Sequence, residues 1–315
     1  MDMSNLLEQG ATLERRLPER IVQGQRLVPA AHGVASALLA DAWLQGRNLS
    51  FLKITIGLSR PAAGRAVDPR IMAQYHERLR GMLRSADALT YLGEGRYLAL
   101  LPGLRDIAAV ALAAGRIIEA LGAPAPAQAA EAPVHVNIGI ARYPEDASQL
   151  TTLLEHAELA LDLSREAGLN CFSFAESSLN DTLDCAALAW NPSLQTGLEA
   201  VEEEHRVLFA RLIAIAGQLR AQASLALLQD SLAQFLGALR EHFVSEERDL
   251  EQITAPSADA HRAEHAMALQ RVRWLANAEP RQAVGLVARY CFDWFEQHAR
   301  SFDRELAQHL QSLNP

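Results

Sequence analysis

Cysteines, long apolar runs and a leading signal segment are scarce or absent in this chain, and each absence excludes a class of protein. Three cysteines occur in 315 residues, Cys171, Cys185 and Cys291, and no two of them form a CxxC pair. This excludes a disulfide framework and is typical of a reducing compartment. No run reaches the roughly 18 consecutive apolar residues that a membrane-spanning helix needs. Because the first residues also lack a basic stretch followed by an apolar one, we expect a cytoplasmic protein without a membrane partner.

Positive charge is also in short supply. Lysine and arginine number 29 against 38 aspartates and glutamates, which gives a formal net charge of −9. Binding to nucleic acid needs a basic face that contacts the phosphates, so this charge balance argues against a nucleic-acid partner. Half of the residues are apolar, and a chain of this length is long enough for two globular domains, each with a core of its own.

Between residues 190 and 315, four segments carry apolar residues at helical spacing, and imidazole or carboxylate groups lie on the same apolar stripes. These polar residues are, in chain order, His205, His242, Glu246, His261, His265, His298 and Asp303. A carboxylate buried among apolar side chains is costly unless it is paired, protonated or bound to a cation. We therefore expect the seven residues to be metal ligands.

The donor atoms and their number narrow the choice of metal. Imidazole and carboxylate ligands suit iron, zinc, copper or nickel, and seven ligands exceed what one tetrahedral zinc ion uses, so two metal ions are the better count. A spacing of four residues places His242 with Glu246, and His261 with His265, on one helical face. The five residues from His298 to Asp303 correspond to roughly 140° on an α-helix, so spacing alone does not pair these two.

The sequence around these ligands resembles a bacterial hemerythrin domain. The motifs that carry the resemblance are Trp190, Gly197, the run from Val201 to His205, the run from His242 to Glu247, the run from His261 to His265, and Trp294 to His298 with Asp303. Glu202 stands where the family usually has Asp, and Leu250 where it often has Met. The resemblance implies a four-helix bundle with two non-heme iron ions that binds dioxygen reversibly. By the same resemblance, Glu246 and Asp303 would bridge the irons and the five histidines would fill most other positions.

Strand-like and helix-like segments alternate between residues 24 and 175. The predicted helices cover residues 28–44, 69–83, 104–121 and 147–167, and the predicted strands cover 51–58, 88–92, 96–101 and 134–141. Gly93-Glu94-Gly95 is typical of a hairpin turn. This order predicts an α/β (α+β) domain with a central sheet flanked by helices. A short helix over residues 1–23 is expected before it, and residues 176–189 form the linker to the helical domain of residues 190–315.

This N-terminal part resembles a GGDEF (diguanylate cyclase) domain. The resemblance is carried by the run from Val136 to Pro144, followed by Leu153-Leu154, Ala157-Glu158, Ala160-Leu161 and Gly168-Leu169-Asn170. The hairpin that holds the family's signature reads Gly93-Glu94-Gly95-Arg96-Tyr97, with Arg96 in place of the acidic Glu and Gly95 in place of Asp. The strand that should supply a metal-binding Asp contains no acid. Because joining two GTP molecules needs acidic groups that hold magnesium, we expect no enzyme activity.

One ligand site of that family is retained in sequence. Arg84-Ser85-Ala86-Asp87 matches the RxxD motif that binds the product, cyclic di-GMP, and it has the right distance from the hairpin. An arginine there can bind phosphate or a guanine edge through two parallel hydrogen bonds, and an aspartate can accept from guanine.

Taken together, the residues predict a dioxygen- or redox-sensing signalling protein. A diiron domain would be coupled to a cyclase-like domain that has lost its chemistry and serves binding or dimerisation. The expected partners are dioxygen, cyclic di-GMP, and a second copy of the chain or a signalling partner protein. The alternatives are a dioxygen storage or delivery protein, an effector that reads cyclic di-GMP through Arg84 and Asp87, and an active cyclase with unusual metal ligation.

Overall fold

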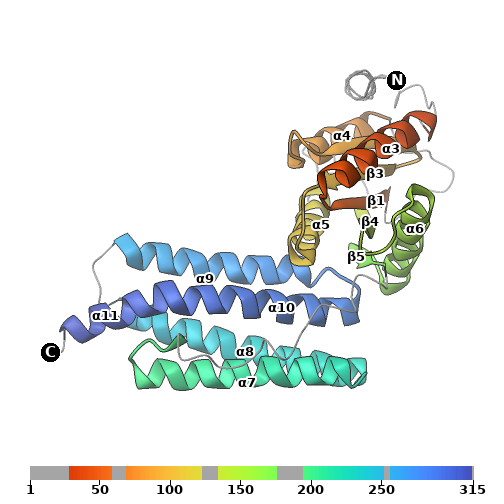
Figure 1. Ribbon diagram of the computed structural model, residues 1–315. Coiled ribbons are helices and arrows are strands. Elements are labelled where there is room, and N and C mark those ends of the chain that lie inside the picture. Colours follow the sequence, from red (N-terminus) through yellow and green to blue (C-terminus); the bar gives the residue numbers. More distant parts are fainter. Residues whose placement is uncertain (1–27, 59–68, 123–133, 176–193, 252–255, 314–315) are drawn as a thin grey trace. The chain divides into compact units, whose positions relative to one another are not determined.

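A computed structural model of the chain describes residues 28–58, 69–122, 134–175, 194–251 and 256–313 (Figure 1). The chain divides into two compact units, which comprise Met1–Asn180 with Asn277–Glu279, and Asp181–Ala276 with Pro280–Pro315. The predicted helix over residues 1–23 and the predicted linker over residues 176–189 lie outside the described residues.

The first unit is a five-stranded sheet with helices on it. Its elements are α3 (Val28–Gln45), β1 (Leu49–Leu58), α4 (Pro69–Met82), β2 (Ala88–Gly93), β3 (Arg96–Pro102), α5 (Ile107–Gly122), β4 (Val134–Tyr143), α6 (Leu150–Ala167) and β5 (Cys171–Phe174). The strand order is β2-β3-β1-β4-β5, and β4 and β5 run parallel while the other neighbours are antiparallel. This confirms the prediction of a mixed sheet domain with flanking helices.

Strand β5 is the element of this unit that the sequence pattern did not predict. It has four residues, Cys-Phe-Ser-Phe, all of them buried. A run this short with both faces covered shows no alternation of apolar and polar residues, so periodicity cannot reveal it. In the same unit, the backbone of Phe172 accepts a hydrogen bond from Glu279 (2.7 Å) and donates one to Asn277 (2.9 Å).

One apolar core of the first unit lies where helices α3 and α6 cover the sheet. Buried residues from both helices and from strands β1, β3 and β4 contact one another, including Ala35, Phe51, Leu100, Ala141 and Leu153. Gly139 on β4 lies directly under α6, and a Cβ atom there would collide with the backbone of Ala157 and Leu161. The close approach of α6 to the sheet therefore requires glycine at this position.

The β2–β3 hairpin is placed tightly against β1. Gly93, Glu94 and Gly95 all have positive φ angles, of 94°, 54° and 73°, which favours the two glycines in this turn. The backbone amide of Ile56 on β1 donates a hydrogen bond to the carbonyl of Gly95 over 2.8 Å. The first residues of β3, Arg96 and Tyr97, follow this turn and lie beside β1, where Thr55 pairs with Arg96.

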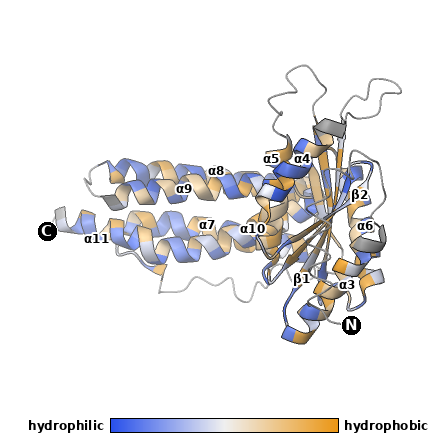
Figure 2. Cartoon of the chain, turned by 90° about the horizontal axis from the view of Figure 1, so that it is seen from above, coloured by the Kyte–Doolittle hydropathy of each residue, from blue (hydrophilic) through white to orange (hydrophobic). Residues whose placement is uncertain are grey.

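The regular elements described in the second unit are all helices. They are α7 (Glu199–Arg220), α8 (Leu225–Leu250), α9 (Pro256–Leu275), α10 (Pro280–His298), the π-helical turn η4 (Ala299–Asp303) and α11 (Arg304–Leu313). Helix α10 contacts α7, α8 and α9. Hydrophilic and hydrophobic residues alternate around these helices (Figure 2), as expected for helices that bury one face. No helix in the described parts of the chain has both the length and the apolar character needed to cross a membrane.

Candidate metal centre

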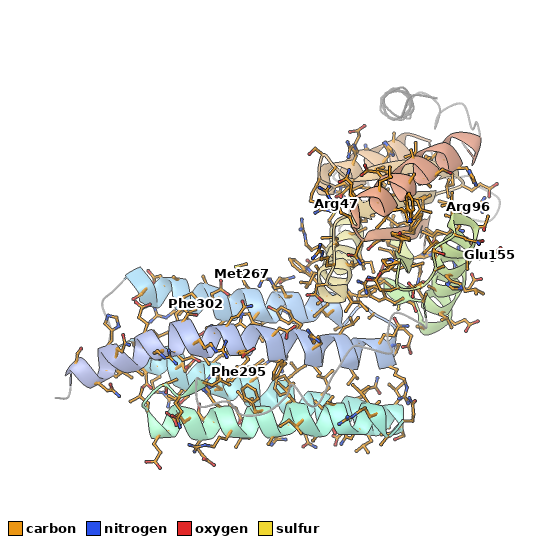
Figure 3. All side chains as sticks on the ribbon, viewed as in Figure 1. Arg47, Arg96, Glu155, Met267, Phe295 and Phe302 are labelled. Carbon is orange, nitrogen blue, oxygen red and sulfur yellow. The ribbon has the colours of Figure 1, made fainter. Side chains whose placement is uncertain are left out.

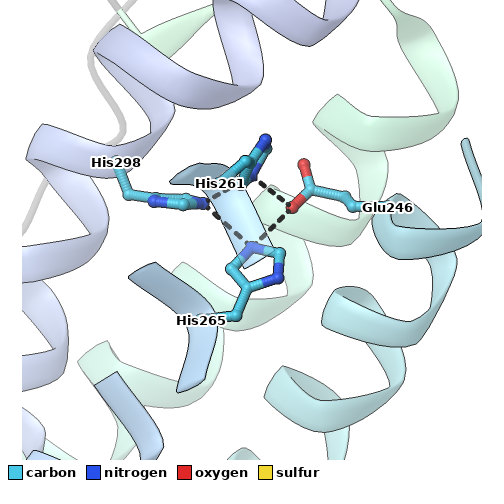
Figure 4. Close-up of side chains that lie close together, drawn as sticks. All are labelled: Glu246, His261, His265 and His298. Carbon is cyan, nitrogen blue, oxygen red and sulfur yellow. Dashed lines mark hydrogen bonds and ion pairs between the residues drawn. The ribbon is translucent and has the colours of Figure 1, made fainter. Parts of the chain in front are cut away.

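All seven residues that the sequence singled out as ligands come together inside the helical unit. They form two groups in which the nitrogen and oxygen atoms lie within 4.8 Å of one another. The first group is Glu246, His261, His265 and His298 (Figure 4), and the second is His205, His242, Glu246 and Asp303. All seven are buried. Helix α7 supplies one of them, α8 two, α9 two, α10 one and η4 one.

Asp303 reaches the centre because the helix changes its winding just before it. Residues Ala299–Asp303 form a π-helical turn, in which hydrogen bonds join residues five apart instead of four. His298 and Asp303 therefore lie one above the other, and His298 Nε2 is 3.0 Å from Asp303 Oδ1. The expectation that a five-residue spacing does not pair these side chains is wrong, since it assumed an uninterrupted α-helix.

The ring nitrogens of the first group lie at hydrogen-bond distance from one another, but these hydrogen bonds cannot all form at once. His298 Nε2 is 2.9 Å from His261 Nε2 and 3.0 Å from His265 Nε2, and Glu246 Oε2 lies 3.5 Å and 3.3 Å from the same two nitrogens (Figure 4). One proton on His298 Nε2 can join only one of its two neighbours. A cation between the atoms would satisfy all of them at once.

The second group contains buried polar atoms that lack hydrogen bonds. Nε2 of His205 and His242 and both carboxylate oxygens of Glu246 and Asp303 are buried without a hydrogen-bond partner. Buried polar atoms in proteins are satisfied in the great majority of cases, so six such atoms in one place require an explanation. Nitrogen and oxygen atoms with free electron pairs that converge in an apolar core fit a transition-metal site.

The two carboxylates lie between the groups. Asp303 Oδ1 faces the first group, 3.3 Å from His261 and 3.0 Å from His298, while Oδ2 faces the second, 3.3 Å from His205. Glu246 Oε2 lies 3.4 Å from His242 in the second group and close to the first group as well. Each carboxylate can therefore contribute to two metal positions.

Electrostatics keeps both carboxylates charged. Burial alone would raise the pKa of Asp303, but the electrostatic interaction with His298 and hydrogen bonds from His205, His261 and His298 hold its pKa well below the usual range. Burial and the charge of Asp303 would likewise raise the pKa of Glu246, but His261 and His265 lower it overall. Ionised carboxylates are the form that binds a metal ion.

Aromatic rings surround the imidazoles and fix their orientation. Phe243 stacks on His265 with ring centroids 3.9 Å apart, and Trp294 stacks on His298 at 4.4 Å. Figure 3 labels Phe295 among the side chains of the helical unit. The ring of Phe295 meets the ring of His205 edge-on at 4.7 Å and also contacts His242. This wall leaves little room for water beside the ligands and restricts rotation of the rings.

Sequence reasoning missed two carboxylates that contact the ligands from outside. Glu204 Oε2 lies 2.8 Å from His242 Nδ1, and Glu247 Oε1 lies 3.2 Å from His265 Nδ1. A signal was present, since Glu204 directly precedes His205 and Glu247 directly follows Glu246. Two adjacent polar residues on a helix face different directions, however, so the sequence does not show which helix each glutamate reaches.

In the first unit, the hairpin and β1 border an open pocket without a cluster of acids. The pocket has a volume of about 520 Å³, and its lining includes Thr55, Glu94, Arg96, His135 and Arg165. Three of these side chains can carry positive charge and one carries negative charge. Among the described residues, groups of histidine, cysteine and acidic side chains that could hold a metal occur in the helical unit alone.

Arg84 and Asp87, the residues of the RxxD motif, bind each other. The Arg84 backbone amide donates to Asp87 Oδ2 over 2.8 Å, and Arg84 Nη2 donates to Asp87 Oδ1 over 2.7 Å and to the carbonyl of Pro102 over 3.1 Å. The Arg84 side chain is 52% exposed, whereas that of Asp87 is 4% exposed. The bond to Asp87 raises the pKa of Arg84, so the arginine stays charged and accessible while the aspartate holds it in place.

Comparison with known proteins finds similarity to a known domain family within the first unit. The family model "Diguanylate cyclase, GGDEF domain" matches residues 62–171. An uncharacterised signalling protein of Caulobacter vibrioides is 26% identical over 121 residues, which cover 38% of this chain and 15% of that protein. The bifunctional diguanylate cyclase/cyclic di-GMP phosphodiesterase MucR of Pseudomonas aeruginosa is 28% identical over 119 residues, which cover 38% of this chain and 17% of that protein. The match thus spans about a sixth of the length of these relatives.

Among solved structures, the chain is similar to the GGDEF domain of YfiN (TpbB) from Pseudomonas aeruginosa. It is 26% identical, with a TM-score of 0.41, and the alignment covers 53% of this chain and 94% of that one. The family match places a GGDEF domain at residues 62–171, as the sequence resemblance implied.

Proposed function

We propose that the helical unit is a four-helix bundle of the hemerythrin type that holds two non-heme iron ions, and that the protein is a dioxygen- or redox-responsive signalling protein. The observation that carries this proposal is the convergence of five buried imidazoles and two buried carboxylates, among which Nε2 of His205 and His242 and all four carboxylate oxygens lack hydrogen-bond partners. The shared position of Glu246 and Asp303 between two groups supports two ions over one.

The chain would hold the two ions unequally. His261, His265 and His298 would hold one ion and His205 and His242 the other, and the carboxylates of Glu246 and Asp303 lie close to both groups. The group with two histidines has fewer protein ligands, so a further ligand would bind there. When bound, the iron pair would supply reversible dioxygen binding and electron exchange.

The remaining contacts of the chain would serve this chemistry. Phe295 lies against His205 and His242 and would exclude water from the metal position that these two histidines serve. Phe243 and Trp294 stack on histidines of the other position and keep their Nε2 atoms directed at the centre. A change in ligation would move the helices that carry the ligands, and the first unit would respond to that movement.

The first unit, which contains the GGDEF domain of residues 62–171 and is called the GGDEF unit, would act without catalysis. At the place where β1 meets the hairpin, Thr55 pairs with Arg96, and Arg165 and His135 lie nearby. A magnesium ion bound to a nucleoside triphosphate would need carboxylate ligands where β1 meets the hairpin. Basic side chains there repel the ion. We infer that the unit serves binding or dimerisation.

Iron analysis of single-residue variants tests this proposal. The protein purified from iron-supplemented cells should contain two irons per chain, and His205→Ala and His265→Ala should each lose iron because each removes one ligand. His309→Ala is the matched control, since His309 is partly exposed and bonds to the carbonyl of Glu305. An iron content that is unchanged in both ligand variants would contradict the proposal.

A second candidate function is cyclic di-GMP binding at Arg84 and Asp87. It is favoured by the half-exposed, permanently charged guanidinium that a buried carboxylate orients, which suits a phosphate or guanine ligand. Isothermal titration calorimetry with cyclic di-GMP should show binding that Arg84→Ala abolishes and that the exposed-residue control Arg47→Ala leaves intact. Equal binding by both variants, or none by the unaltered protein, would remove this candidate.

A further inference from the structure

Glu204 and Glu247 stand in the same relation to the centre, one for each metal position. Glu204 directly precedes His205 on α7, yet its carboxylate contacts His242 on α8. Glu247 lies next to Glu246 on α8, yet its carboxylate contacts His265 on α9. In both cases the chain neighbour of one ligand supports a ligand on the following helix.

Both contacts join a solvent-facing carboxylate to a buried ring. The side chains of Glu204 and Glu247 are 39% and 43% exposed, whereas those of His242 and His265 are 1% exposed. A glutamate in this position keeps part of its hydration, so its charge is not costly to retain. The ring it contacts is oriented by a hydrogen bond that needs no metal.

The contacts also decide which ring nitrogen carries the proton. A carboxylate accepts, so Nδ1 of His242 and of His265 must donate, and in the neutral ring this places the lone pair on Nε2, which faces the centre. Nδ1 of His205 and of His298 is buried without a hydrogen-bond partner. Each metal position therefore combines a histidine that a carboxylate orients with one that has no such support.

A neighbouring glutamate shows that the arrangement is selective. Glu203 belongs to the same acidic run on α7, but its side chain is 69% exposed and pairs with Arg206 on its own helix over 2.9 Å. Glu203 is a matched control for Glu204, because it carries the same charge on the same helix and its carboxylate pairs with Arg206.

We propose that Glu204 and Glu247 are positioning residues that set the tautomer and orientation of His242 and His265, and that each tunes one of the two metal positions separately. This inference rests on the proposed diiron function. Two divalent cations carry more charge than Glu246 and Asp303 offset, and the two outer carboxylates compensate part of the remainder through the imidazoles. Partners of this kind typically change metal affinity by roughly 10- to 100-fold.

The experiment removes iron stepwise from the full-length protein with a ferrous chelator under anaerobic conditions. The unaltered protein should release two tightly bound irons, whereas Glu204→Ala and Glu247→Ala should each release one iron roughly 10- to 100-fold more readily and keep the other. Gln variants should lie between, because their amide oxygen accepts from Nδ1 but carries no charge. Glu203→Ala should match the unaltered protein, and Ala variants that hold both irons as tightly as Glu203→Ala would overturn the inference.

A second readout works without metal and separates this inference from the proposed function. Nitrogen NMR of the metal-free protein should show His242 and His265 with the proton fixed on Nδ1, and Glu204→Ala and Glu247→Ala should each release the tautomer of one ring. If the unaltered protein binds no iron, the proposed function fails, while this result still supports the positioning role. Unchanged tautomers in both variants would overturn it.

Discussion

Asp303 lies five residues after His298 in the chain, and yet its Oδ1 is 3.0 Å from His298 Nε2. The π-helical turn Ala299–Asp303 makes this possible, because one hydrogen-bonded turn there spans five residues. Ser301 Oγ donates to the carbonyls of Gln297 (2.8 Å) and His298 (3.4 Å) and so satisfies acceptors that the wider turn frees. The turn thus directs the last carboxylate of the set into the core.

Phe295 should control how long the iron pair stays reduced in air. Phe295→Leu shortens the side chain beside His205 and His242 and admits water to the position with two histidines. We expect the ferrous protein to oxidise irreversibly several-fold faster, as followed by its visible spectrum over time.

The control for this variant is Phe235→Leu. Phe235 is equally buried on α8, 1% exposed, about two turns before His242. Both variants should lower the free energy of unfolding, by about 1 to 3 kcal/mol for a partial loss of buried volume. Equal oxidation rates in the two variants would show that Phe295 acts through stability alone.

The sequence predicts those contacts of the site that join residues of one regular helix, and it does not predict contacts between helices. The His242–Glu246 and His261–His265 pairs follow from α-helical periodicity, so they could be predicted. Asp303 follows from it only once the π turn is known, and local sequence carries no clear sign of such a turn. The contacts of Glu204 and Glu247 join different helices, and periodicity within one helix cannot show which helices are neighbours.

The same limit applies to the sheet. The strands of the β2–β3 hairpin could be predicted because the turn residues Gly93 and Gly95 are local signals. Strand β5 pairs in parallel with β4, more than 25 residues away in sequence, along register pairs such as Asn137 with Cys171. No local sequence pattern indicates which strand β5 pairs with, so β5 could not be predicted from the sequence.

The purified protein should form no cyclic di-GMP from GTP and magnesium. The double variant Thr55→Asp with Arg96→Glu returns two carboxylates to the place where β1 meets the hairpin and should bind magnesium with GTP measurably more tightly by calorimetry. Formation of cyclic di-GMP by the unaltered protein, followed by chromatography, would contradict the assignment of a non-catalytic role.

Acid should destabilise the first unit through His76. This side chain is 3% exposed and stacks on Tyr97. Burial is the main cause that lowers its pKa below 6.5, with Arg80 acting in the same direction and Glu77 against it. The unfolded chain therefore takes up the proton first as pH falls. The stability that neutral His76 provides is complete above its unfolded pKa and is lost as pH falls through the lower folded value.

The measurement for His76 is the thermal unfolding midpoint between about pH 7.5 and pH 5.5. His76→Phe keeps an aromatic ring against Tyr97 but cannot titrate, so its midpoint should fall less over this range than that of the unaltered protein. Parallel curves for the two proteins would mean that His76 does not contribute to the acid sensitivity.

The proposed diiron site can be tested by the visible spectrum of the anaerobically reduced protein before and after exposure to air, together with its metal content. A diiron site that binds dioxygen should give two irons per chain and a ligand-to-metal charge-transfer band that appears in air and disappears when dioxygen is removed. A chain with one metal or none, or a spectrum that does not change on exposure, would contradict it.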